Sequence, residues 1–158
     1  MDYLTNEIRE ATRVGLWHVA LQASLAAIDI CAALNSEDGR TTGARFKQWA
    51  ADWIGSSPIH PDYLWQLRCG ILHEGRLKET PSVVFTVPLK AGWVVHQNSV
   101  DGVQQVDLLL FCNEICTKIE SWWELSKERE PVATNAMSLV RERPDGLPGF
   151  GNAVRVIA

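Results

Sequence analysis

The sequence predicts a mainly α-helical bundle that carries a small antiparallel β-hairpin insertion. Apolar residues recur at helical spacing in four segments, at about residues 4–35, 44–54, 61–75 and 107–127. A separate stretch, at about residues 82–106, is rich in β-branched and aromatic residues. Hydrophobic residues make up 46% of the 158 residues and charged residues 22%, so the chain can bury the core of one domain.

The first segment predicts one long helix over residues 4–35. Its apolar face consists of Val14, Leu21, Leu25, Ile28 and Ala32. The run from Leu16 to Leu34 is apolar enough to raise the question of a membrane span. Polar residues within it, such as His18 and Asp29, favour a buried helix of a soluble protein. The N-terminus has acidic residues and no basic segment, which predicts no secretory signal and a cytoplasmic location.

The next two helices are predicted over residues 44–54 and from Pro61 to about Gly75. Proline suits the first helical position because its missing N–H would have no helical partner there. Gly75 is a plausible residue to cap the end of that helix. Two strands are predicted at Val83–Val87 and Trp93–Gln97, joined by a turn, with a short third strand at Val103–Val106.

The last helix is predicted to begin after Asp107, which serves as its N-cap, and to run to about Lys127. Its apolar arc covers more than half of its circumference, so it is either deeply central or buries a second face against another chain. From Arg129 onward Pro, Gly and Arg recur and periodicity is lost. We therefore place one helical domain at residues 1–128 and a loosely ordered or docked tail at 129–158.

Charge and cysteine content limit the function classes. The net charge of −4 argues against broad, sequence-independent binding to nucleic acid, but leaves room for a local phosphate site. Cys112 and Cys116 lie four residues apart on one helical face, and no CxxC pair is present, so small core residues are favoured over metal ligands. No Gly-rich phosphate loop or zinc pattern occurs, and we expect neither a cofactor nor a metal.

The chemistry-bearing pattern is Arg68 followed five residues later by His73. A guanidinium holds a phosphate through two parallel bonds, and an imidazole accepts or donates a proton near neutral pH. On a regular helix the two side chains differ by about 140° in direction and about 7.5 Å in rise, so they would splay. They would act together if the helix bent at Gly70 or if two copies met across a dimer axis. The same spacing occurs at Arg13 and His18, where we expect a structural role.

The segment Leu67-Arg-Cys-Gly-Ile-Leu-His-Glu-Gly75 resembles the signature of the HEPN superfamily, in which an Arg precedes a His late in a helix. It is closer still to bacterial HEPN-like proteins that carry Leu-Arg-Cys-Gly-x-x-His-x-Gly. As in those proteins, an early helix holds the pair Ile28-Asp29, a later one holds Arg45-Phe46, and strands precede the last helix. The resemblance spans about residues 10–127 in the order of elements, and only the nine-residue segment is specific.

The resemblance implies an all-helical, usually dimeric fold and a metal-independent RNase activity of a prokaryotic defence or toxin type. Arg68 would bind the scissile phosphate and His73 would act on the ribose hydroxyl. Active relatives usually carry a polar residue, often Asn, where this chain has Cys69. Asp29, Cys69 and Glu74 are supporting candidates, and a buried Asp29 would need a partner, which is either Arg68 or a hydroxyl or backbone group.

Two functions stay open on the sequence. The first is an RNA-cleaving or RNA-binding protein, an endoribonuclease that needs no metal. The second is a non-catalytic homodimeric interaction or scaffold module whose partner is another protein, such as an antitoxin. Tryptophans such as Trp65 and the pair Trp122-Trp123 could stack on bases, but packing in the core or in an interface is favoured. Neither function involves a membrane.

Overall fold

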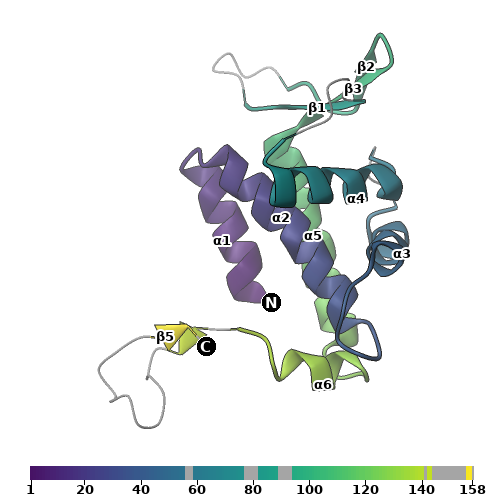
Figure 1. Ribbon diagram of the computed structural model, residues 1–158. Helices are drawn as coiled ribbons and strands as arrows, with labels where there is room; N and C mark the ends of the chain where they lie inside the picture. Colours follow the sequence, from purple (N-terminus) through teal and green to yellow (C-terminus); the bar gives the residue numbers. More distant parts are fainter. Residues whose placement is uncertain (56–58, 77–81, 89–93, 141, 144–155, 158) are drawn as a thin grey trace.

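Three helices, α1, α2 and α5, run side by side through the centre of the molecule (Figure 1). The computed structural model describes residues 1–55, 59–76, 82–88, 94–140, 142–143 and 156–157. Its helices are α1 (Asp2–Arg13), α2 (Trp17–Leu34), α3 (Gly43–Trp53), α4 (Pro61–Cys69), which continues as the π-helical turn η1 (Gly70–Glu74), α5 (Leu108–Ser126) and α6 (Val132–Ala136). Its strands are β1 (Val83–Thr86), β2 (Asn98–Val100), β3 (Val103–Asp107), β4 (Glu142–Arg143) and β5 (Val156–Ile157). The prediction of a mainly helical fold is confirmed.

The single long helix predicted over residues 4–35 is wrong, because the chain reverses between α1 and α2. Gly15 lies in the left-handed region at φ 78°, a conformation that favours glycine. The Leu16 N–H bonds back to the carbonyl of Ala11 at 2.8 Å and closes the turn. Val14, which was expected on the apolar face, is 51% exposed at this reversal. The apolar spacing runs on through the turn, and this is why periodicity alone missed it.

Helix α5 is buried over a wide face, with α1 and α2 both packed along it, and is exposed along a narrower face that includes Thr117, Ser121 and Glu124. Its buried side chains are Leu108, Phe111, Cys112, Ile115, Cys116, Ile119, Trp122 and Ser126. An ion pair also joins α1 to α5, since Arg9 Nη2 donates to Glu120 Oε2 at 2.8 Å. The wide apolar arc was expected to reflect either a central position or a second face buried against another chain. The packing within one chain accounts for most of the arc, which favours the central position. Leu110 and Leu125 on this helix remain exposed.

The β insertion is a three-stranded mixed sheet, so the predicted antiparallel hairpin of residues 83–87 and 93–97 is wrong. Strand β1 pairs with β3 in parallel, and β2 pairs with β3 antiparallel, in the order β1-β3-β2. Residues 94–97 form no strand, and residues 89–93 lie outside the described residues. The hairpin that does form turns at Asp101 and Gly102, both with positive φ, as in the turns that match strand twist.

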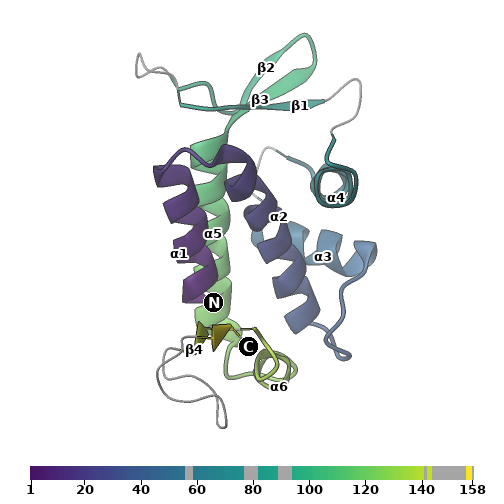
Figure 2. The ribbon, with the colours of Figure 1, turned by 60° about the vertical axis from the view of Figure 1, so that its left-hand side comes forward.

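The sheet is attached to one end of the helical bundle through β3, which leads directly into α5 (Figure 2). Asp107 is the N-cap, as predicted: its Oδ1 accepts the N–H of Leu110 at 2.9 Å. The N–H of Asp107 donates in turn to His96 Nδ1 at 3.2 Å. The predicted third strand at Val103–Val106 is confirmed and extends to Asp107.

Helix α6 packs at the opposite end of the bundle (Figures 1 and 2). Val132 is buried, and the side-chain amide of Asn135 donates to the carbonyls of Leu34 and Ser36 at 3.0 and 2.8 Å. These bonds satisfy carbonyl groups that the end of α2 would otherwise leave unpaired.

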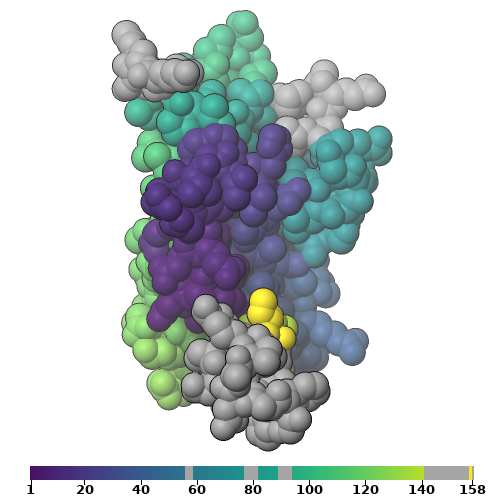
Figure 3. Space-filling view, turned by 90° about the vertical axis from the view of Figure 1, so that its left-hand side faces the viewer, coloured from purple at the N-terminus to yellow at the C-terminus, as the bar shows by residue number. Residues whose placement is uncertain are grey.

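Figure 3 shows the outer face of the molecule, where α1 lies in front of α2 and α5.

Helix α2 is long and apolar enough, by length and composition, to cross a membrane. Half of that window is buried inside the molecule, and nine of its side chains are buried. The packing of α1, α3 and α5 against it fits the prediction of a core helix.

We predict that Gly15→Ala lowers the free energy of unfolding by about 1–2 kcal/mol, because a Cβ strains the left-handed conformation. Chemical denaturation monitored by circular dichroism measures this loss. Gly15→Asn is the matched control, since Asn tolerates the left-handed region better, and its loss should be smaller. Equal stability of Gly15→Ala and the wild type would contradict a reversal that depends on Gly15.

Candidate functional site

The candidate site lies where α4 crosses α2 (Figure 1). Asp29 comes from α2, Arg68 from the last turn of α4 and His73 from η1. Arg68 Nε and Nη2 donate to Asp29 Oδ2 at 3.2 and 2.5 Å. Arg68 Nη1 contacts His73 Nε2. One guanidinium therefore bridges the carboxylate and the imidazole, and Arg68 is the partner of Asp29 that the sequence left open.

A change of helix type at Gly70 brings Arg68 and His73 together. In η1 the hydrogen bonds join residues five apart, so side chains five positions apart come roughly into line instead of splaying. The turn needs a glycine at position 70, because a Cβ there would lie 2.7 Å from the carbonyl oxygen of Arg76. Gly75 ends it in the left-handed conformation at φ 65°, and its role as a cap is confirmed. The sequence offered a bend at Gly70 as one of two ways to bring the pair together, and the structure has a π-helical turn there.

The contact with Arg68 involves Nε2 of His73. A guanidinium carries donors and no acceptor, so in a hydrogen bond between the two side chains Nε2 is the acceptor. An acceptor nitrogen in this position is also what a general base requires.

Trp65 supports the guanidinium from one face. The carbon Cζ of Arg68 lies 5.2 Å from the centre of the Trp65 ring, within the range of a cation–π contact. The indole packs on Phe46, with ring centres 5.3 Å apart, and on Gly43, where a Cβ would lie 2.9 Å from indole Cε2. Trp65 thus packs against α3 and under Arg68. Sequence reasoning missed the role of Gly43, because no spacing pattern links it to Trp65.

Burial separates the three side chains of the site. The side chains of Arg68 and Asp29 are 15% and 14% exposed, whereas His73 is exposed at the surface. Asp29 Oδ1 is buried and has no hydrogen-bond partner within the described part of the chain. One oxygen of the carboxylate thus bonds to Arg68, and the other can accept a hydrogen bond from a further donor.

The other predicted residues lie apart from this cluster. Glu74 is exposed and its Oε2 accepts from Arg76 Nε at 2.7 Å. Cys69 is half-buried at the end of α4, and across residues 59–76 no hydrogen bond joins it to Arg68 or His73. Arg13 pairs with Glu10 in α1, while His18 is exposed in α2 beyond the chain reversal. The second Arg–His spacing is therefore divided between two helices.

Cys112 and Cys116 are fully buried core residues, as predicted. Burial raises the pKa of the Cys112 thiol to about 11 and that of Cys116 to about 12, because it disfavours the charged thiolate. The pKa of Cys31 is also raised by burial. Across the described ranges, no group of three His, Cys, Asp or Glu side chains is arranged to hold a metal ion.

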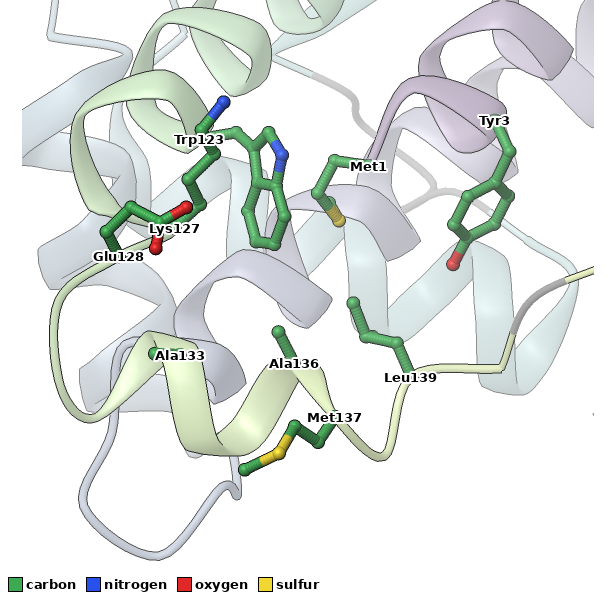
Figure 4. A pocket seen from close by; sticks show the side chains of 9 residues that line it. All are labelled: Met1, Tyr3, Trp123, Lys127, Glu128, Ala133, Ala136, Met137 and Leu139. Carbon is green, nitrogen blue, oxygen red and sulfur yellow. The ribbon is translucent and has the colours of Figure 1, made fainter.

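A groove of about 360 Å³ lies far from Arg68, between the start of α1, the end of α5 and α6 (Figure 4). Most of its lining is apolar: Met1, Tyr3, Trp123, Ala133, Ala136, Met137 and Leu139, with Lys127 and Glu128 beside them. The candidate site residues Asp29, Arg68, Cys69, His73 and Glu74 do not line it, whereas Trp123, one of the tryptophans considered for base stacking, does.

No protein-family model, curated protein or solved structure matches this chain. The resemblance to the HEPN superfamily therefore depends on the segment from Leu67 to Gly75 and on the order of the elements around it.

We predict that Gly70→Ala disrupts η1 and separates His73 from Arg68, because the added Cβ meets a backbone oxygen that cannot rotate away. The free energy of unfolding should fall by about 1–3 kcal/mol. In ¹H–¹⁵N spectra of the imidazole, the Nε2 signal of His73 should shift as it loses its donor. Gly75→Asn is the control, since Asn tolerates the left-handed cap and should keep the contact. An unchanged His73 signal in Gly70→Ala would refute this account of the turn.

Proposed function

We propose that this chain is a HEPN-like protein that cleaves RNA without a metal, of a prokaryotic defence or toxin type. The observation that carries the proposal is the π-helical turn, which sets a guanidinium and the Nε2 of an imidazole side by side on one helix. A cation for the phosphate and a base for the ribose hydroxyl are the groups that internal cleavage requires.

The proposed reaction is a transesterification within the RNA chain. His73 Nε2 accepts the proton of the ribose 2′-hydroxyl, and the 2′-oxygen forms a bond to the adjacent phosphorus. The bond from phosphorus to the 5′-oxygen breaks, and that oxygen leaves with a proton from His73 or from water. Arg68 stabilises the negative charge that grows on the phosphoryl oxygens. The products carry a 2′,3′-cyclic phosphate and a 5′-hydroxyl.

Asp29 and Trp65 act here through Arg68. The carboxylate and the indole hold the guanidinium from one edge and one face, which reduces the freedom it must lose when it binds a phosphate. Cys69 occupies the place where active relatives usually have a polar residue. A thiol is a weak hydrogen-bond donor, so we assign Cys69 no positioning role.

The alternative function is a non-catalytic, homodimeric interaction or scaffold module, and two observations favour it. Arg68 is mostly buried and already has an acidic partner, as an Arg that stabilises the packing of α2 against α4 would. The net charge of −4 also suits a protein partner, such as an antitoxin, better than a polyanion.

We predict that the wild type cleaves single-stranded RNA in excess chelator and leaves 2′,3′-cyclic phosphate ends. His73→Ala should lower the rate by about 10²–10⁴-fold, because it removes the group that transfers the proton. Arg68→Ala should lose activity through the missing charge, and Arg68→Lys should recover only part of it, since an ammonium cannot make a two-pronged contact. Gel analysis of labelled RNA measures both the rates and the chemistry of the ends.

The matched control is His18→Ala, since His18 follows Arg13 at the same spacing but lies on another helix. Its activity should equal that of the wild type. Each variant is checked for folding by circular dichroism. Equal rates in the wild type and His73→Ala, or no cleavage in either, would reject the enzyme and leave the interaction module.

We also predict a homodimer, which both functions share. The expectation comes from the HEPN resemblance and from exposed apolar side chains such as Leu110 and Leu125. Sedimentation velocity at micromolar concentration measures the mass. A single species of 17.6 kDa would contradict the dimer.

A further inference from the structure

We propose that Arg68 and His73 block each other in the resting protein, and that a phosphodiester group of RNA releases both. The inference rests on the proposed function, because it concerns how the same two side chains become available to RNA. It assigns Asp29 a second role, which is to oppose the binding of phosphate until a substrate competes for Arg68.

The guanidinium of Arg68 has few donors left for a phosphate. Its Nε and Nη2 both donate to Asp29 Oδ2, which occupies one of the two edges that can make a two-pronged contact. The remaining edge is formed by Nη1 and Nη2, and Nη1 contacts His73. Trp65 covers one face of the group. In the proposed block, a phosphate that takes the free edge displaces His73 from Nη1.

The same contact occupies the base. His73 Nε2, the nitrogen that would accept the ribose proton, faces Arg68. While this contact lasts, Nε2 is not available to the ribose hydroxyl. An anionic phosphate oxygen accepts a stronger hydrogen bond from a guanidinium than a neutral ring nitrogen does. The phosphate can therefore displace His73, which is exposed at the surface, and so release the base beside the bound phosphate.

Asp29 sets how readily this exchange occurs. Its carboxylate lies 2.5 Å from Arg68 Nη2 and is mostly buried, so its charge is poorly screened by water. It offsets the charge of the guanidinium and repels an incoming phosphate. Removing that charge while keeping the shape of the side chain should make Arg68 a stronger phosphate site.

The test measures binding of a fluorescent single-stranded deoxyoligonucleotide, which offers phosphodiesters without the attacking 2′-hydroxyl. Asp29→Asn should bind the oligonucleotide at least about fivefold more tightly than the wild type. Two charges in contact interact, even when water screens them, by a free energy that corresponds to a factor of this size in affinity. His73→Ala should also bind more tightly, because it frees Nη1, although it removes the base. Double variants that combine Arg68→Ala with Asp29→Asn or with His73→Ala should lose the added affinity for the oligonucleotide.

Asp38→Asn is the matched control. Asp38 pairs with Arg45 at 2.5 Å on another surface, so its substitution changes the net charge equally without touching the site. In the wild type, added oligonucleotide should shift the Nε2 signal of His73. Circular dichroism checks each fold, and the surface position of His73 makes His73→Ala an independent arm if Asp29→Asn does not fold.

The outcomes separate the two proposals. Tighter binding by Asp29→Asn and His73→Ala without RNA cleavage by the wild type would support the mutual block and reject the nuclease. Weaker binding by both variants would overturn the block, because it would show that Asp29 and His73 assist binding. No binding by any variant would overturn it as well, since nothing would have been released. Equal gains in Asp29→Asn and Asp38→Asn would reduce the effect to net charge and overturn it too.

Discussion

Helix α5 has a wide apolar face that must be covered by other elements, and this constraint shapes the whole chain. Helices α1 and α2 cover it lengthwise, α3 packs against it, and the sheet is joined to its first turn through Asp107. The reversal at Gly15 supplies two of these covering helices from one apolar segment. Helix α4 in turn packs on α2, so the position of Arg68 depends on how α5 is enclosed.

Local signals predicted the parts of the fold that local chemistry determines. Pro61 begins α4, Asp107 caps α5 and Gly75 ends the π-helical turn, each for a reason that can be stated from neighbouring residues. The reversal at Gly15 was missed because its flanking residues keep the apolar spacing of a helix. The predicted strand pairing was wrong because β1 pairs with β3, which follows β2 in the sequence. Composition carries no information about which strands pair.

The candidate site, too, was predicted in part from the sequence. Residue chemistry and a family resemblance selected Arg68 and His73, and the need of a buried carboxylate for a partner made Arg68 one of the candidates for Asp29. Ideal helix geometry predicted that the pair would splay, and only the widened turn brings them together. That turn depends on the close approach of the Arg76 carbonyl to Gly70, a contact that no periodic pattern reports.

The burial of three thiols has a practical consequence for experiments on this chain. Cys31, Cys112 and Cys116 have no exposed surface and carry thiols whose pKa is raised, so alkylating reagents reach and activate them poorly. Cys69 is the remaining cysteine, half-buried and adjacent in sequence to Arg68. The natural sequence therefore offers a near-unique attachment point for a spin label or a fluorophore beside the site, with no engineered cysteine.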